Sequence, residues 1–174
     1  MSEKMSARDS ILYTLRTINR ELGCPQADEP KLGPHLRYED RVAQFTEVAQ
    51  VVGGEVVELQ GSLLETLVAL GVDTENIVSS LGEFREMAVN PDEVADVHEL
   101  GGDYTAVVRG AIGVAENGAV WVPVEGRRKA HIFACQHLVI VLDHDKIIDT
   151  MEDAVAQISL KDIDYGVFIS GPSK

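Results

Sequence analysis

The chain is poor in cysteine, with only Cys24 and Cys135 among its 174 residues. Two thiols so far apart cannot supply a four-cysteine iron–sulfur motif or a zinc motif, and they do not form a disulfide framework. The expected state is two reduced thiols in a cytoplasmic protein. We therefore expect no metal and no cofactor bound by this chain itself.

Basic residues are also scarce: 15 lysines and arginines stand against 29 acidic residues, a net charge of −14. Nucleic acids and anionic membranes require clustered positive charge, so neither is expected as a partner. No apolar run approaches the roughly 20 residues of a membrane span, and residues 1–6 lack the apolar core of a signal peptide. The composition, 45% hydrophobic, is that of an ordinary soluble globular protein. The length fits one domain with a sizeable core.

Helix signals dominate the first half of the chain. Capping patterns begin at Ser6 and Ser62, and glycines close the helical patterns near residues 23, 53 and 71. Residues 24–37 hold three prolines and read as a loop, so residues 1–23 are expected to be a helical arm and residues 38–174 an α/β domain. The remaining expectations for this half are short strands at residues 55–59 and 77–78, and a loop with one helical turn at residues 90–103.

After residue 103 the pattern changes to strands rich in valine and isoleucine. They are expected at residues 105–109, 111–115, 119–124, 132–135, 138–142 and 166–170. Several are apolar on both faces, which indicates a sheet covered on both sides. A helix capped by Thr150 precedes the last strand. The whole pattern predicts an α/β fold with a mixed, largely parallel sheet.

The stretch Ala115-Glu116-Asn117-Gly118 joins two of these apolar strands. Asn-Gly is the strongest short-range signal for a tight hairpin because both residues tolerate positive φ. Glu116 is then a lone carboxylate at the tip of a hairpin with buried arms. It is either a solvated turn residue or a functional carboxylate at the edge of an apolar layer.

This stretch begins a resemblance to the LUD-domain family, whose best-known member is lactate-utilisation protein C. The family has an Ala-Glu-Thr-Gly-Thr-like turn, an Arg-containing loop, a strand opening with His, and a closing strand that runs into Gly-Pro-Ser. The matching positions here are Glu116-Asn117-Gly118, Arg127-Arg128, His137 and Gly171-Pro172-Ser173. Asn117 and Ala119 replace the family's hydroxyl residues. The family continues into Thr-Ala-Asp-Ile-Glu whereas this chain ends at Lys174, so the C-terminal end of the family domain is expected to be missing.

The resemblance implies a three-layer α/β/α fold of the sugar-phosphate isomerase and CoA-transferase superfamily. It implies a cytoplasmic component of an L-lactate utilisation system, oxidising lactate to pyruvate, with the iron–sulfur clusters on partner proteins. Class I CoA transferases carry a Ser-Glu-Asn-Gly motif with a nucleophilic Glu. A stand-alone enzyme of CoA-transferase or sugar-phosphate type using Glu116 is thus one alternative, and a non-catalytic interaction subunit is another. A homo-oligomer is left open.

The expected site gathers the catalytic candidate Glu116 with a set of ligand-binding candidates around a small anionic ligand. The ligand-binding set is Asn117, Gly118, Arg127, Arg128, His137, Gly171, Ser173 and Lys174. Guanidinium groups bind carboxylate or phosphate bidentately, and glycine-rich turns after strands can hold an anion. Three of these groups also have a purely structural interpretation. In it, Arg127 and Arg128 lie in a solvated basic loop, His137 is a hydrogen-bonded histidine at the start of a strand, and residues 171–174 are a frayed chain end.

Overall fold

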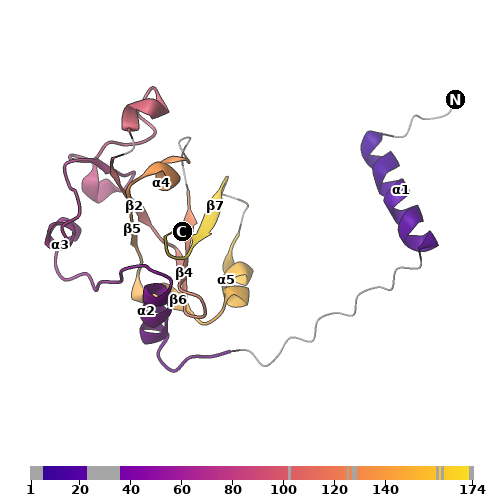
Figure 1. The fold of residues 1–174 in the computed structure, drawn as a ribbon, viewed down its shortest axis with the longest axis horizontal. Helices are drawn as coiled ribbons and strands as arrows, with labels where there is room; N and C mark the ends of the chain where they lie inside the picture. Colours follow the sequence, from indigo (N-terminus) through magenta and orange to yellow (C-terminus); the bar gives the residue numbers. More distant parts are fainter. Residues whose placement is uncertain are drawn as a thin grey trace. The chain divides into compact units, whose positions relative to one another are not determined.

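The structure is a computed structural model that describes residues 6–22, 36–101, 103–124, 126, 129–159, 161 and 163–172 (Figure 1). The chain divides into two units, Met1–His35 and Leu36–Lys174. The first unit contains helix α1 (Ala7–Glu21), whose N-cap Ser6 accepts a hydrogen bond from the backbone N–H of Asp9. The expected helix and its cap are thus confirmed.

The body, residues 36–172, begins with two helices that have side-chain N-caps, of which the one at Ser62 was predicted and the one at Asp40 was not. Helix α2 (Arg41–Val51) starts at Asp40, whose carboxylate accepts the N–H of Ala43, and helix α3 (Leu63–Ala69) has a complete capping box between Ser62 and Glu65. The last helix, α5 (Met151–Gln157), is capped by Thr150 as expected. Side-chain acceptors here satisfy N–H groups that the first helical turn leaves without intrahelical partners.

Seven strands form two sheets. The first is fully parallel, in the order β1 (Ile77–Val78), β2 (Thr105–Arg109) and β5 (His137–Val141), with Val107 opposite Val139. The second is mixed. Its order is β6 (Ile147–Ile148), β3 (Ile112–Val114), β4 (Ala119–Pro123) and β7 (Gly166–Ile169). The chain passes directly from β2 to β3 and so joins the sheets.

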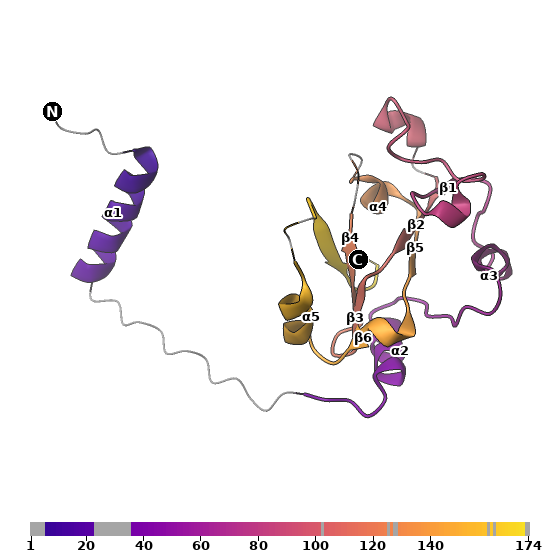
Figure 2. The ribbon, with the colours of Figure 1, turned by 180° about the vertical axis from the view of Figure 1, so that it is seen from behind.

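The largest core cluster lies between the two sheets. Val108 of the first sheet and Val120 and Val122 of the second meet there with Phe45 and Ala49 of α2. Helix α3 covers the other face of the first sheet through Leu67 and Val107, and α5 covers the other face of the second through Ala154 and Val114. Helices therefore flank the β layers on both outer sides, and the predicted α/β class is confirmed (Figures 1 and 2).

Two strand predictions are wrong. Residues 131–134 form a short helix, α4, in which the N–H groups of Phe133 and Ala134 both bond to the carbonyl of Ala130. The turn buries His131 and Ile132 and exposes Phe133 and Ala134, whereas the continuous apolar run at residues 132–135 predicted a strand. Residues 55–59 belong to no strand, although Val56 packs against the core.

Several short elements complete the body. The 3₁₀ helices are Gly82–Phe84, Val97–Leu100 and His144–Lys146. The second of these is the helical turn expected within residues 90–103, whereas strand β6 was not predicted. Its two residues pair in parallel with Gly113 and Val114, and they bring residue 149 to the end of the hairpin that carries Glu116.

Candidate functional site

Glu116 lies in the turn between β3 and β4. The hairpin is present, but its loop has four residues, 115–118, because Val114 pairs with Ala119. The N–H of Gly118 donates to the carbonyl of Val114 at 2.9 Å, and the Asn117 side-chain oxygen accepts the N–H of Ala119 at 3.1 Å. The predicted hairpin is therefore present, and of the two turn residues Asn117 and Gly118 only the glycine has positive φ, +65°.

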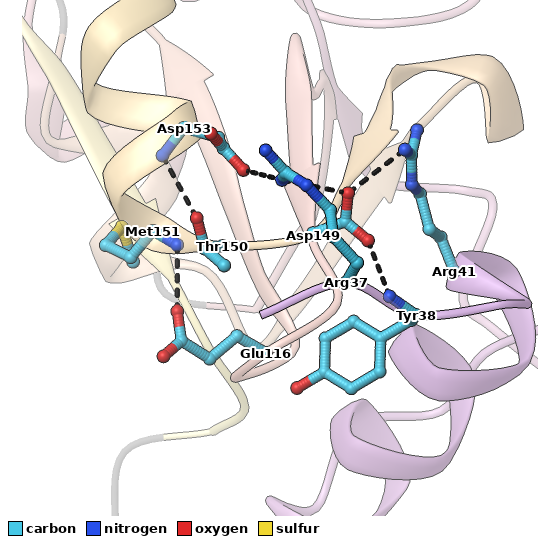
Figure 3. A network of polar contacts seen from close by, with 8 residues as sticks. All are labelled: Arg37, Tyr38, Arg41, Glu116, Asp149, Thr150, Met151 and Asp153. Atoms are coloured by element: carbon cyan, nitrogen blue, oxygen red, sulfur yellow. Dashed lines mark hydrogen bonds and ion pairs between the residues drawn. The ribbon is translucent and has the colours of Figure 1, made fainter. Parts of the chain in front are cut away.

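The Glu116 side chain reaches the start of α5. Its Oε2 accepts the backbone N–H of Met151 at 2.9 Å, and its own N–H donates to the carbonyl of Asp149 at 3.0 Å (Figure 3). The carboxylate therefore supplies an acceptor to the first turn of α5, where negative charge is favourable. Within the described part of the chain Oε1 has no hydrogen-bond partner, and the residue is exposed. One carboxylate oxygen is thus available to a ligand.

Next to this contact lies a buried carboxylate that the sequence analysis did not single out. Asp149, only 2% exposed, accepts the N–H of Tyr38 on Oδ1 at 2.9 Å. Its Oδ2 meets Nη1 of Arg37 at 3.2 Å and Nη2 of Arg41 at 3.0 Å. Arg37 also bonds to Asp153 of α5. Figure 3 shows the three side chains Arg37, Arg41 and Asp149 converging between α2 and α5.

The electrostatics of this group follow from its contacts. Burial alone would raise the pKa of Asp149, but the N–H of Tyr38 and the guanidinium groups of Arg41 and Arg37 outweigh it, and the pKa lies below its ordinary value. The hydrogen bond and charge of Asp153, followed by those of Asp149, raise the pKa of Arg37. The contacts thus favour the charged forms of both Asp149 and Arg37.

The two guanidinium groups are held in place and still face solvent. Their side chains are 55% (Arg37) and 49% (Arg41) exposed. A guanidinium carries five N–H donors, so the donors that the aspartates leave unused can bind a small carboxylate. Arg41 also lines an open groove of about 400 Å³ together with Tyr38, Glu39, Asp40, Val42, His144, Asp145 and Ile147.

The segment after β7 meets the Glu116 turn. The hydroxyl of Ser170 donates to the carbonyl of Asn117 at 2.9 Å. Gly171, at φ +67°, lies so close to α2 that a Cβ there would stand 2.3 Å from the carbonyl oxygen of Val52. The structure thus places the turn that carries Glu116, Asn117 and Gly118 beside Ser170, the residue before Gly171.

His137 is not part of this group. It opens β5, and its register partner is Thr105 at the start of β2. Glu116 follows β3, which the chain reaches only after running the length of β2, so the path through β2 and β3 separates the start of β5 from the Glu116 turn. Arg127, Arg128, Ser173 and Lys174 lie outside the described residues.

Arg37, Arg41, Asp149 and Asp153 are the polar residues that sequence reasoning missed. One weak signal exists for Asp149, which is an acidic residue directly after the apolar pair Ile147-Ile148. The two arginines stand four residues apart beside the first predicted helix of the body, which is also typical of a solvated helix face.

Two kinds of feature are absent from the described residues. They contain no group of three or more His, Cys, Asp or Glu side chains placed to hold a metal ion. Among the described helices, none has the length and apolar character needed to cross a membrane.

Comparison with known proteins gives a family match for the second half of the chain. Residues 95–174 match the family model of the LUD domain, which confirms the resemblance drawn from the sequence. The fold is similar to the crystal structure of a DUF162 family protein from Deinococcus radiodurans, with a TM-score of 0.61 and 16% identity over 79% of this chain and 90% of that one. No curated protein matches the chain.

Proposed function

We propose, from the LUD domain in residues 95–174, that this chain is the LUD-domain component of an L-lactate utilisation system. In this system L-lactate loses two electrons and two protons to give pyruvate. Iron–sulfur proteins that bind to the chain accept the electrons. The observation that carries the proposal is the family match, which includes the turn with Glu116.

The geometry supports a substrate site that a partner protein completes, rather than one that this chain encloses by itself. Glu116 is exposed, and one of its carboxylate oxygens is already bonded to α5. Arg37 and Arg41 present solvent-facing N–H groups that suit a substrate carboxylate. Glu116 is the candidate base for the hydroxyl proton of lactate, and a partner protein would cover the open side.

The test uses the chain in its host and a single conservative change. Glu116→Gln keeps the acceptor oxygen for Met151 and removes the charge, so folding should be unchanged. We expect loss of growth on L-lactate at a melting temperature within about 3 °C of wild type, since the first turn of α5 loses a favourable charge but keeps its acceptor. Glu47→Gln, at another exposed carboxylate in the body, is the matched control and should grow normally. Normal growth of the Glu116→Gln variant on L-lactate would show that the Glu116 carboxylate takes no part in the reaction.

The partners are tested separately by anaerobic purification of a tagged chain from cells grown on lactate. Cysteine-rich iron–sulfur proteins should co-purify, and adding L-lactate should reduce their clusters, as followed by electron paramagnetic resonance. Purification of the chain without such proteins would contradict the lactate role.

A second candidate is a stand-alone enzyme of CoA-transferase type, favoured by the exposed carboxylate in an Ala-Glu-Asn-Gly turn. Such an enzyme forms a covalent acyl-glutamate by attack of the carboxylate on an acyl-CoA, with the CoA thiolate leaving. Incubation with acetyl-CoA or succinyl-CoA followed by mass spectrometry of the peptide containing Glu116 distinguishes it. An adduct there would replace the lactate proposal. If both tests fail, the chain is better interpreted as a non-catalytic interaction subunit.

A further inference from the structure

The direction of the Glu116 carboxylate is set by the residues that join β6 to α5. The backbone N–H of Glu116 donates to the carbonyl of Asp149 at 3.0 Å, and Oε2 accepts the N–H of Met151 at 2.9 Å. A glutamate side chain has several rotatable bonds and would otherwise sample different staggered rotamers. The position of Met151 therefore determines where the other carboxylate oxygen, Oε1, points.

The two elements on either side of this junction are short. Strand β6 has two residues, which pair with Gly113 and Val114 of β3, and α5 has seven. A helix of that length is not stable in water by itself. Its cap, the bond from the N–H of Asp153 to the Thr150 hydroxyl, lies within the helix end. The position of the junction therefore depends on contacts from other parts of the chain.

Asp149 provides polar contacts of that kind. Its side chain is 2% exposed, and Oδ1 accepts the N–H of Tyr38 at 2.9 Å. Oδ2 lies 3.2 Å from Nη1 of Arg37 and 3.0 Å from Nη2 of Arg41. All three partners belong to residues 37–41, at the start of α2. Asp149 therefore anchors the junction to a segment that is distant in the sequence.

Arg37 also connects the two sides of Met151. Its guanidinium group meets Asp149, which precedes Met151 by two residues, and Asp153, which follows it by two. Figure 3 shows these contacts beside the bond between Met151 and Glu116. The N–H that holds the Glu116 carboxylate thus lies between two anchored residues.

We propose that Asp149 is a positioning residue, which fixes the junction between β6 and α5 and so directs Oε1 of Glu116 toward the substrate hydroxyl. This inference rests on the role of Glu116 as a base in the proposed function. Asp149 itself does not meet the substrate, because its side chain is buried and both of its oxygens have partners. A displacement of about 1 Å at a reacting group can lower a rate on the order of 100-fold, so the anchor matters for the reaction as well as for the fold.

The first test needs no substrate and measures hydrogen exchange of single backbone amides in the full chain by NMR. The Met151 amide is the reporter, since its bond to Glu116 protects it from exchange. The amide of Val107 in the central strand β2 is the internal reference for global unfolding. In the Asp149→Asn variant we expect Met151 to exchange about tenfold faster relative to Val107.

Two further variants make this test decisive. Asp145→Asn changes an exposed carboxylate shortly before β6 and should leave the Met151 exchange rate within about twofold of wild type. Asp153→Asn removes the other carboxylate that Arg37 contacts, keeps Asp149, and should accelerate Met151 exchange about threefold. An unchanged Met151 rate in Asp149→Asn, or in Asp153→Asn where the former does not fold, would overturn the proposal.

The second test separates positioning from a general effect on stability. The rate of cluster reduction by saturating L-lactate is measured in the complex with the iron–sulfur proteins, so that changes in substrate affinity do not enter. Asp149→Asn should lower this rate about 10- to 100-fold when residue 116 is glutamate. Glu116→Asp keeps a carboxylate but is too short to hold the Met151 contact, so adding Asp149→Asn to it should cost less than about threefold.

The outcomes distinguish this inference from the proposed function. Equal losses from Asp149→Asn with and without Glu116→Asp would overturn the positioning role, although lactate oxidation would stand. A complex whose clusters L-lactate does not reduce would overturn the proposed function. Faster exchange of Met151 in Asp149→Asn would still establish that Asp149 controls the contact of Glu116 with α5.

Discussion

At the residue scale, two carboxylates of similar intrinsic chemistry are used in different ways. Asp149 is buried, and its oxygens meet the N–H of Tyr38 and two guanidinium groups, so its charge is needed to hold the local structure together. Glu116 is exposed and keeps one oxygen without a partner among the described residues. Solvent access and an unused acceptor are what a ligand requires, which is why Glu116 and not Asp149 is the candidate for chemistry.

Gly118 offers a test of the turn that carries Glu116. Its φ is +65°, and a Cβ there would lie 2.8 Å from the backbone nitrogen of Ala49. Gly118→Val should cost about 2–6 kcal/mol of unfolding free energy, from about 1–3 of backbone strain and a similar term for overpacking. Gly71→Val is the control, because Gly71 also has positive φ, +70°, but a Cβ there would meet no atom within 4 Å. It should lose only the free energy that corresponds to backbone strain. Urea unfolding gives both values, and equal losses would mean that contact with α2 adds no cost.

Residues that act through neighbours in sequence were predictable, and residues that act through distant partners were not. The turn at Asn117-Gly118 was found because its hydrogen bonds span two to four residues. The contact of Glu116 with Met151 spans 35 residues, and that of Arg37 with Asp149 spans 112. No spacing rule links such positions, because the folding of β6 beside β3 creates their proximity.

At the scale of elements, prediction succeeded where a cap or a long apolar run defines the ends. Helix α3 begins at the Ser62–Glu65 capping box, and β2 has the predicted bounds. It failed at the predicted strand 132–135, because a four-residue apolar run fits a short helix, here His131–Ala134, as well as a strand. It also failed at β6, because a two-residue strand is set by its partner and has too little length for a pattern.

Asp149 joins three elements, and its lowered pKa gives this junction a pH dependence. A carboxyl with a lower pKa in the folded state stabilises the fold above its unfolded value of about 3.9, and the stabilisation is lost as pH falls through the folded pKa. Asp149→Asn should therefore cost about 1–3 kcal/mol at pH 7, and the difference from wild type should shrink below pH 4. Chemical unfolding between pH 3 and pH 7 measures it.

The control for this junction is Asp145→Asn, because the Asp145 side chain is 65% exposed. It should stay within about 0.5 kcal/mol of wild type across the same range. A constant difference between Asp149→Asn and wild type down to pH 3 would show that the carboxylate's charge contributes nothing to the junction.

At the scale of the whole molecule, the proposed function requires that partner proteins, and not this chain, bind the iron–sulfur clusters. Its two cysteines cannot ligate a four-cysteine cluster. Purified alone under anaerobic conditions, the chain should contain well under one iron per molecule by elemental analysis, and the double change Cys24→Ser with Cys135→Ser should not alter that content. The complex with its iron–sulfur partners should contain iron. Stoichiometric iron in the isolated chain would show that it holds a site of its own.

Net charge is the other property of the whole molecule with a measurable consequence. A charge of −14 opposes compaction, and salt screens that repulsion over a Debye length of about 10 Å at 0.1 M. The melting temperature should therefore rise by a few degrees between about 10 and 150 mM NaCl at fixed protein concentration. The triple change of Glu47, Glu55 and Glu86 to Gln removes three exposed negative charges and should reduce the rise. A melting temperature that falls with salt would mean that the ion pairs around Asp149 contribute more to stability than the overall repulsion removes.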